Sequence, residues 1–219
     1  MSTIEEQRGL PGLAFPEESL KRLATELAAE YAGIFSAQTV GRYVLESYAA
    51  RLRTSTIKAH LITTTARFVR ERLTALAQTL DAAPKDVPEV LFVCVQNAGR
   101  SQMAMGLMNE LAGGRVHVRS AGSMPASDIS DTVITAMDNI GIDITSEFPK
   151  PLTDDVVQAA DVVITMGCGD ACPVYPGKRY IDWHLPDPDG LTPEGVAEVR
   201  ELIREHVQRL LAELVPQGT

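Results

Sequence analysis

Cysteine, positive charge and long apolar runs are all scarce in this sequence of 219 residues. The three cysteines, Cys94, Cys168 and Cys172, are an odd number that does not suit a closed disulfide framework. Thiols in a reducing compartment are more often catalytic, redox-active or metal-binding. The sequence contains neither an apolar run of 18 residues nor a signal peptide, so we expect a soluble, cytoplasmic protein with no membrane partner.

Positive charge is outnumbered, with 20 Lys and Arg against 29 Asp and Glu and a net charge of -9. An acidic chain is a poor general binder of nucleic acid, so any affinity for anions should be local. Basic residues do gather between 51 and 72, but the interleaved aromatics of a single-strand binder are missing there. We therefore interpret this basic region as a solvated face and expect no nucleic-acid partner.

What the sequence does contain is a strand, tight loop and helix over residues 90–105. A short apolar run ends at Cys94, a loop follows, and a helical pattern covers 102–111. A loop that enters a helix turns unpaired N–H groups and the positive end of the helix dipole toward one point, which makes an anion site. That point holds a cysteine and, six positions later, Arg100.

The pairing of cysteine and arginine has a chemical logic. A thiol attacks as its thiolate, which the amides, the dipole and the Arg100 guanidinium would stabilise. The same groups can grip a tetrahedral oxyanion over the sulfur. Ser101 could donate a hydrogen bond to the thiolate, and Asn97 could hold the loop in shape. The predicted oxyanion-binding residues are Val95, Gln96, Asn97, Ala98, Gly99, Arg100 and Ser101. The alternative is an inert, buried cysteine beside a surface arginine.

The first part of the chain is predicted to be helical. After a mobile lead-in, apolar residues recur every three or four positions over 20–31, 40–52 and 57–80, which predicts a three-helix bundle. Ser36 and either Thr54 or Ser55 are candidate N-caps. A proline-containing linker over 81–89 places the boundary near 84. The predicted domains are 1–84, the helical bundle with its lead-in, and 85–219.

Beyond that boundary strands and helices alternate. Strands are predicted at 90–93, 116–119, 162–166 and 179–183, and helices at 102–111, 129–140, 155–160 and 192–214, the last with Thr192 as N-cap and Pro193 at its first position. This order predicts an α/β fold, a four-stranded parallel sheet with helices on both faces. Ligands bind outside the carboxyl ends of such strands, where Cys94 and the segment from Gly167 should meet.

Two further groups of residues should reach the same edge. Asp187 and Pro188 follow the last strand; a carboxylic acid held by prolines can protonate a departing oxygen, although a plain proline-rich turn fits equally. Cys168 and Cys172, flanked by glycine, make a flexible thiol pair. Zinc with His184 as a third ligand would leave a tetrahedral site incomplete, so we expect no metal. A disulfide relay would use all three thiols, and a structural pair stays open.

The run from Cys94 to Ser101 matches C-x5-R-[ST], the signature of the low-molecular-weight protein tyrosine phosphatase superfamily, which the chain resembles. Over about 88–214 it resembles the three-cysteine arsenate reductases built on that fold. The matching segments are the Cys94 loop, Ser120 to Ser123, Gly141 to Thr145, the cysteine pair ahead of Pro173, and Asp187-Pro188. The two later cysteines stand closer together than is usual in that family. The helical region resembles an extension of actinobacterial members.

This resemblance implies arsenate as substrate and no cofactor. Cys94 would attack arsenate held by the loop and Arg100, while Asp187 protonates the departing oxygen. Cys168 would then attack the sulfur of Cys94, and Cys172 would attack Cys168, leaving a disulfide for thioredoxin to reduce. The alternatives are a reductase in which a small thiol such as mycothiol takes over after Cys94, a tyrosine phosphatase, and a non-enzymatic oxyanion sensor.

The role of the helical region is a separate question. We expect it to pack on the catalytic domain or on another copy of itself, which would make a homodimer through the N-terminal helices.

Overall fold

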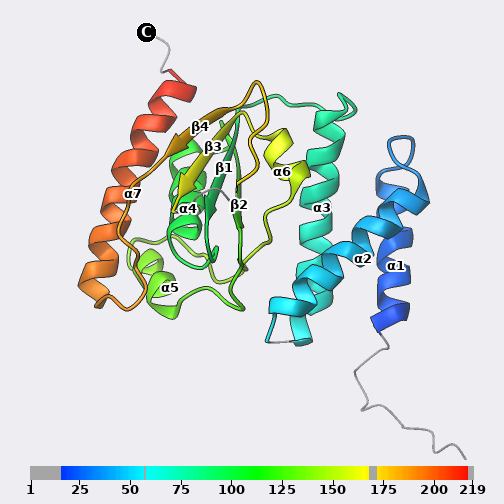
Figure 1. Ribbon diagram of the computed structural model, residues 1–219, viewed down its shortest axis with the longest axis horizontal. Helices are drawn as coiled ribbons and strands as arrows, with labels where there is room; N and C mark the ends of the chain where they lie inside the picture. The colour runs from blue at the N-terminus through cyan, green and yellow to red at the C-terminus, as the bar shows by residue number, and fades with distance from the viewer. Residues whose placement is uncertain (1–15, 57, 168–171, 217–219) are drawn as a thin grey trace, which may run out of the picture.

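The computed structural model in Figure 1 describes residues 16–56, 58–167 and 172–216. Its centre is a parallel sheet in the order β2-β1-β3-β4. The strands are β1 (Glu89–Cys94), β2 (His117–Gly122), β3 (Val162–Met166) and β4 (Arg179–Asp182). The predicted α/β fold with a four-stranded parallel sheet is confirmed. Both the lead-in predicted for the first residues and Cys168 lie outside the described residues.

Helices cover both faces of the sheet. Every residue of β1 is therefore buried, and its side chains alternate between two apolar clusters. Phe92 and Cys94 face the first cluster, and Leu91 and Val93 face the second. Over the first cluster lie α4 (Arg100–Ala112), α5 (Asp131–Asp138) and α7 (Pro193–Leu214). Over the second lie α6 (Asp154–Ala159) and α3 (Leu61–Thr79).

The N-terminal helices are α1 (Pro16–Glu30), α2 (Ala37–Thr54), the short 3-10 helix η1 (Lys58–His60) and α3. They share a core that includes Leu27, Val44 and Leu73, which is the expected three-helix packing. Figure 1 shows α3 between α6 and the other two helices. Ala75 of α3 joins the second sheet cluster, so α3 is a layer of both parts of the molecule. The boundary near 84 stays a prediction.

Two of the predicted helix N-caps agree with the structure, and a third does not. Ser36 caps α2 by accepting the N–H of Thr39 at 3.1 Å, and Thr192 caps α7 in the same way. The N-cap expected at Thr54 or Ser55 is wrong: α2 continues through Thr54, and the N–H of Ser55 donates to Arg51 O at 2.9 Å. α3 begins after η1 instead.

β2 is longer than its sequence pattern predicts, ending at Gly122 rather than at 119. Residues 120–122 have small side chains with little strand preference, but they pair in register with Phe92, Val93 and Cys94 of β1. At the other edge, Trp183 directly follows β4 and packs against Phe92, with ring centroids 5.6 Å apart and the ring planes tilted by 50°. Long-range pairing thus decides where these strands end.

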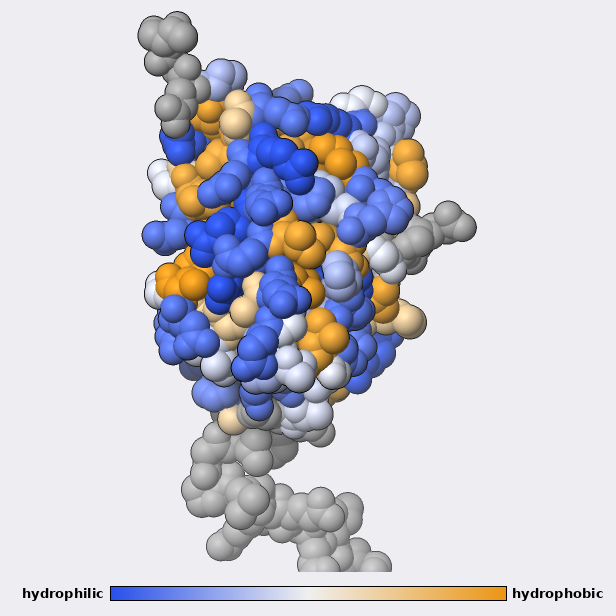
Figure 2. Space-filling model, turned by 90° about the vertical axis from the view of Figure 1, so that its left-hand side faces the viewer, coloured by the Kyte–Doolittle hydropathy of each residue, from blue (hydrophilic) through white to orange (hydrophobic). Residues whose placement is uncertain are grey.

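The face over α7 mixes hydrophilic and hydrophobic residues, with the hydrophilic ones prevailing (Figure 2). Leu202 is the one large apolar side chain that this helix leaves exposed. In the part of the chain that the structure describes, no helix is long and apolar enough to cross a membrane.

Candidate active site

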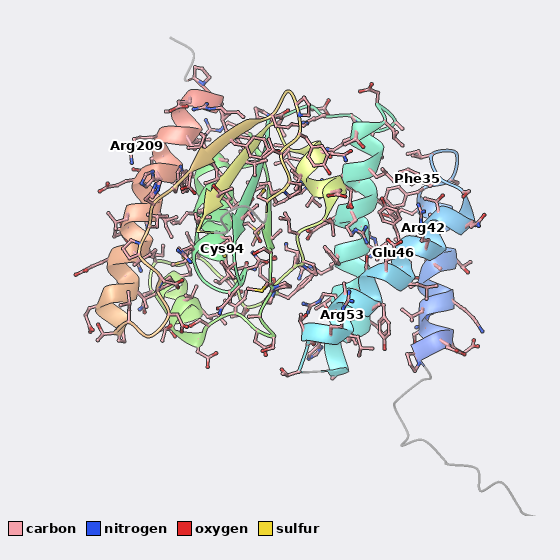
Figure 3. All side chains as sticks on the ribbon, viewed as in Figure 1. Phe35, Arg42, Glu46, Arg53, Cys94 and Arg209 are labelled. Carbon is pink, nitrogen blue, oxygen red and sulfur yellow. The ribbon has the colours of Figure 1, made fainter. Side chains whose placement is uncertain are left out.

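Cys94 is the last residue of β1 and lies near the middle of the sheet at its carboxyl edge (Figure 3). Only 3% of the residue is exposed. Its Sγ accepts a hydrogen bond from the N–H of Asn97 at 3.2 Å and lies 3.0 Å from the hydroxyl oxygen of Ser101. The N–H of Asn97 is therefore a donor to the sulfur, and the Ser101 hydroxyl is close enough to be a second one.

The loop after Cys94 turns its carbonyl groups away from the sulfur. Four of these carbonyls accept N–H groups of the segment 123–130: Cys94 O from Ser123, Val95 O from Met124, Gln96 O from Ala126 and Ala98 O from Ser130. The N–H groups of Gln96, Gly99 and Arg100 have no hydrogen-bond partner among the described residues. They are available to an anion at the start of α4, where the helix dipole adds positive potential.

A cavity of about 180 Å³ opens above this loop. It is lined by Cys94, Val95, Gln96, Gly99, Arg100 and Asp187. The cavity therefore joins the thiol, part of the predicted oxyanion loop, the arginine and the predicted acid in one space.

Arg100 and Asp187 form an ion pair across this cavity, with Nη2 and Oδ2 2.6 Å apart. The arginine side chain is 11% exposed and the carboxylate 60%, so Asp187 stands at the mouth. The guanidinium also donates to Leu185 O at 3.3 Å. A Cβ on Gly167, which has a φ of +75°, would lie 3.3 Å from Nη1 of Arg100. The residue that precedes Cys168 therefore lies directly against the arginine.

Gly99 brings the loop of Asp187 close to the oxyanion loop. A Cβ at Gly99 would lie 2.8 Å from Cγ of Pro188, so any larger residue would push the Pro188 ring outward. The predicted pair Asp187-Pro188 therefore lies directly against the oxyanion loop.

Asn97 holds the loop from inside. It has a φ of +50° and is fully buried, and its Nδ2 donates to Ser101 Oγ at 2.7 Å. Its Oδ1 accepts the backbone N–H of Lys150 at 2.8 Å and Nε2 of Gln102 at 3.2 Å. The role predicted for Asn97 agrees with these contacts, whereas no sequence pattern singles out Gln102 or Lys150. In the sequence Gln102 is one polar residue of a predicted helix, and Lys150 belongs to no motif.

The structure does not bring Cys172 into this cavity. The residue is 7% exposed and packs in the second cluster with Val93, whereas Cys94 belongs to the first. The Sγ of Cys172 donates to Pro173 O at 3.9 Å. Cys168 lies outside the described residues, so the predicted relay stays a prediction. The side chain of His184 is 90% exposed, and its Nε2 lies 3.3 Å from Oδ2 of Asp182.

Known proteins match both parts of the chain. The family described as low molecular weight phosphotyrosine protein phosphatase matches residues 89–218, and the family described as protein-tyrosine-phosphatase-like, N-terminal domain matches residues 20–77. The glutaredoxin arsenate reductase of Synechocystis is 36% identical over 129 residues, which are 58% of this chain and 98% of that protein. The putative arsenate reductase of Halobacterium salinarum is 35% identical over 130 residues, or 57% of this chain and 92% of its own.

Solved structures extend the match to the N-terminal helices. The thioredoxin-dependent arsenate reductase Cg_ArsC1' of Corynebacterium glutamicum is 47% identical and has a TM-score of 0.84, with 90% of this chain and 96% of that chain covered. An arsenate reductase in the phosphate binding state is 35% identical, with a TM-score of 0.51, and covers 59% of this chain and 100% of its own. With its cysteine and arginine loop at the end of β1, this chain belongs to the low molecular weight phosphotyrosine protein phosphatase family.

Proposed function

We propose that this chain reduces arsenate to arsenite, with Cys94 as nucleophile, Cys168 and Cys172 as a thiol relay, and thioredoxin as the reductant. The observation that carries the proposal is the buried Cys94 sulfur at the floor of a small cavity lined by loop residues and Arg100. The likeness to a thioredoxin-dependent arsenate reductase over 90% of the chain supports this chemistry over others that the same loop would permit.

Substrate binding begins with an exchange of partners at Arg100. In the structure its guanidinium is paired with Asp187. Arsenate presents several oxygens to the amides of Gln96, Gly99 and Arg100, and its charge competes for the guanidinium. Once Arg100 binds the oxyanion, the carboxyl group of Asp187 is released from the ion pair and can act on the departing oxygen.

The first covalent step joins sulfur to arsenic. The thiolate of Cys94 attacks arsenic(V) and displaces one oxygen, which leaves as water after taking a proton from Asp187. Arsenic stays in oxidation state V in the resulting thioester-like adduct. The loop amides hold its remaining oxygens.

Reduction occurs when a second thiol arrives. The thiolate of Cys168 attacks the sulfur of Cys94, a disulfide forms, and the bond from sulfur to arsenic breaks. Its electron pair stays on arsenic, which becomes arsenic(III) and leaves as arsenite after protonation. The two electrons come from the two thiols, so no cofactor is required.

The last step restores the nucleophile. Cys172 attacks the sulfur of Cys168, which releases Cys94 as a thiolate and leaves the disulfide on the pair 168 and 172. Cys172 packs in the cluster on the other face of the sheet, so it must leave that position before an external dithiol protein reaches the disulfide. Thioredoxin supplies the two electrons that reopen it.

Turnover with single cysteine variants tests the relay. Arsenate-dependent NADPH consumption is measured with thioredoxin and its reductase for the native chain and for Cys94→Ser, Cys168→Ser and Cys172→Ser. The relay requires that all three substitutions abolish turnover and that Cys172→Ser accumulate a disulfide between Cys94 and Cys168, detected by mass spectrometry. Loss in Cys94→Ser alone would instead point to a small thiol such as mycothiol, or to a phosphatase.

Two other expectations stay proposals. A homodimer through the N-terminal helices would use the surface that α1 and α2 leave open, and the mass of the native chain in solution decides it. A cytoplasmic location is consistent with a relay that depends on reduced thiols.

A further inference from the structure

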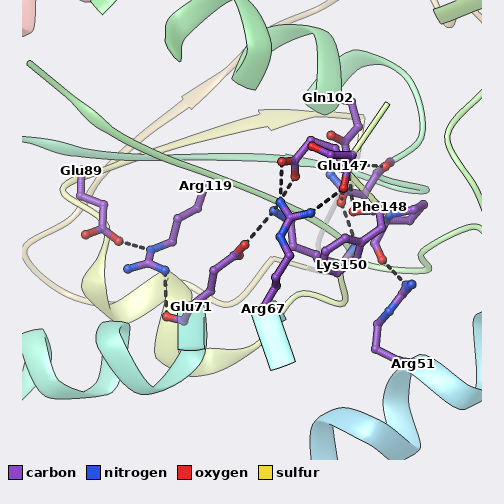
Figure 4. A network of polar contacts seen from close by, with 12 residues as sticks. Arg51, Arg67, Glu71, Glu89, Gln102, Arg119, Glu147, Phe148 and Lys150 are labelled. Atoms are coloured by element: carbon purple, nitrogen blue, oxygen red, sulfur yellow. Dashed lines mark hydrogen bonds and ion pairs between the residues drawn. The ribbon is translucent and has the colours of Figure 1, made fainter. Parts of the chain in front are cut away.

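We propose that the N-terminal helices position the oxyanion loop, with Arg67 and Glu71 of α3 as positioning residues that act through the segment 146–150. The inference deepens the proposed function and rests on it for the role of Cys94 as nucleophile. Figure 4 shows the part of the network that joins α2 and α3 to the segment 146–150 and to Gln102.

The first link runs from the sulfur to the segment 146–150. Ser101 contacts Cys94, and Asn97 donates to Ser101. Asn97 in turn accepts the backbone N–H of Lys150 at 2.8 Å. Because this bond fixes the amide of Asn97, the position of Lys150 sets the orientation of the donor behind the nucleophile.

A second link reaches the same loop from the same segment. The carbonyl of Phe148 accepts Nε2 of Gln102 at 3.2 Å, and that nitrogen also donates to Asn97 O at 3.1 Å. Gln102 is fully buried, so these hydrogen bonds are shielded from bulk solvent. Two residues of the segment thus hold the loop through separate hydrogen bonds.

The segment itself forms neither a helix nor a ladder strand, and side chains of the N-terminal helices keep it in place. Arg67 donates to Ser146 O and pairs with Glu147 at 2.7 Å. Arg51 of α2 donates to Pro149 O. Glu71 pairs with the Nζ of Lys150 at 3.2 Å. Backbone and side chain are both held from α2 and α3.

Charge and packing make these contacts costly to lose. The Lys150 side chain is 3% exposed, and its ammonium is paired only with Glu71 and, at 3.5 Å, with Glu147 among the described residues. A buried charge without its partner is strongly unfavourable. The ring of Phe148 is 4% exposed and lies under three cations, Arg51 at 4.6 Å, Arg67 at 5.2 Å and Lys150 at 5.5 Å. The catalytic domain also holds the segment, because Lys150 O accepts the N–H of Gly122 at 2.8 Å, and α2 and α3 add the contacts to residues 146–150 given above.

The test measures the reactivity of Cys94 and the anion affinity of the oxyanion loop, neither of which requires turnover. In a chain that carries Cys168→Ser and Cys172→Ser, the rate of alkylation of Cys94 by iodoacetamide is measured against pH, and the affinity for inorganic phosphate is measured by titration. The variants are Glu71→Gln and Arg67→Met, with Arg67→Lys as the conservative replacement. Arg70→Met is the matched control, because Arg70 lies on the same helix but pairs with exposed Glu30.

We expect Glu71→Gln and Arg67→Met to raise the midpoint of the alkylation profile and to weaken phosphate binding by roughly two- to thirtyfold, the usual span for coupling through a contact network. Arg67→Lys should recover part of the loss, and Arg70→Met should match the native chain. In an Asn97→Ala background the same substitutions should have a smaller effect than in the native chain, because one of the two links is already cut.

Three results would overturn the inference. One is an unchanged midpoint and phosphate affinity in both variants, even with a lowered melting temperature, since that is a purely structural effect. Another is an equal change in Arg70→Met. The third is full additivity with Asn97→Ala. Arsenate turnover is measured separately: its absence in the native chain would sink the proposed function, whereas the alkylation and phosphate results would still decide the role of α3.

Discussion

Asp187 pairs with Arg100 in the structure, and the proposed mechanism also makes it the acid that protonates the departing oxygen. Substituting Asp187→Asn keeps the shape of the side chain but removes the transferable proton and the competing negative charge. We expect kcat for arsenate to fall by about 10²- to 10⁴-fold, the usual contribution of a general acid, while KM does not rise because Arg100 is freed for substrate. Steady-state kinetics check this. Asp189→Asn, at an exposed neighbouring carboxylate, is the control and should stay near the native rate.

Gly99 sets how closely the loop that contains Asp187 and Pro188 approaches the oxyanion loop. In Gly99→Ala the new methyl group would lie 2.8 Å from Cγ of Pro188, so the ring and the adjacent Asp187 must move outward. Because a misplacement of about 1 Å can cost about 100-fold in rate, we expect kcat to fall by tenfold or more, with a smaller change in phosphate affinity. Equal losses in both quantities would show that the substitution damages the oxyanion loop itself.

Glu89 gives the fold a pH dependence of its own. Burial raises the pKa of its carboxyl, but the hydrogen bond from His117 and the charge and hydrogen bond of Arg119 outweigh this and lower the pKa to about 2 from 4.5. Because the pKa is lower in the folded than in the unfolded chain, the ionised carboxyl stabilises the fold at pH values above the unfolded pKa. This stabilisation is lost as pH falls from about 4.5 to about 2.

The matching variant is Glu89→Gln, which has no such titration. We expect the free energy of unfolding of the native chain, measured with urea, to lose about 3 kcal/mol more than that of Glu89→Gln over this pH window. A difference between the two proteins that stays constant from pH 5 to pH 2 would contradict this assignment.

At the scale of elements, the joint between α3 and α6 is a buried ion pair. Arg72 donates from two nitrogens to Asp155, with distances of 3.2 to 3.3 Å, and from a third to Ser47 of α2 at 3.0 Å. The Arg72 side chain therefore connects α2 and α3 to α6, which lies over the second face of the sheet.

Removing one member of this pair leaves Asp155 buried without its counter-charge. We expect Arg72→Met to lower the free energy of unfolding by about 3 to 5 kcal/mol in urea or thermal denaturation. The control is Arg42→Met on α2, whose exposed contact with Glu46 at 3.9 Å should contribute less than about 1 kcal/mol. Similar effects of the two substitutions would mean that burial of Arg72 does not matter.

The elements of this fold were largely predictable because local signals agree with the final packing. Apolar periodicity locates α1, α2 and α3, and the unbroken apolar run of β1 matches a strand buried on both faces. Residues 120–122 escaped prediction because their strand exists only through pairing with β1. The cap of α3 was misplaced because the chain inserts η1 before the helix, which no capping residue announces.

The site was predictable only where its residues are close in sequence. The loop from Cys94 to Ser101 is one continuous stretch, so its strand, turn and helix announce an anion site. The contacts of Lys150 with Asn97 and Glu71 join segments 53 and 79 residues apart, and sequence patterns contain no trace of them. Such contacts arise from the topology that brings 146–150 between α3 and the loop.

For the whole molecule, the second face of the sheet depends on helices that precede the catalytic domain. We expect a truncated chain that begins at Pro88 to lose arsenate reductase activity by at least tenfold and to melt at a lower temperature, because Leu91, Val93 and Phe148 lose part of their cover. Turnover, thermal unfolding and mass in solution are the measurements. Full activity at unchanged mass would show that the N-terminal helices serve neither catalysis nor assembly.

The outward-turned carbonyls of the oxyanion loop have a consequence for selectivity. They are held by the segment 123–130, so the inward N–H groups stand ready before any ligand arrives. Such groups recognise oxygens and not the atom to which the oxygens are bound, and arsenate and phosphate present the same oxygens at the same charge. Discrimination therefore cannot occur at the moment of capture. It occurs later, when the second thiol attacks, because arsenic can accept two electrons at that step and phosphorus cannot. Abundant phosphate therefore slows turnover by occupying the site, but it is not reduced.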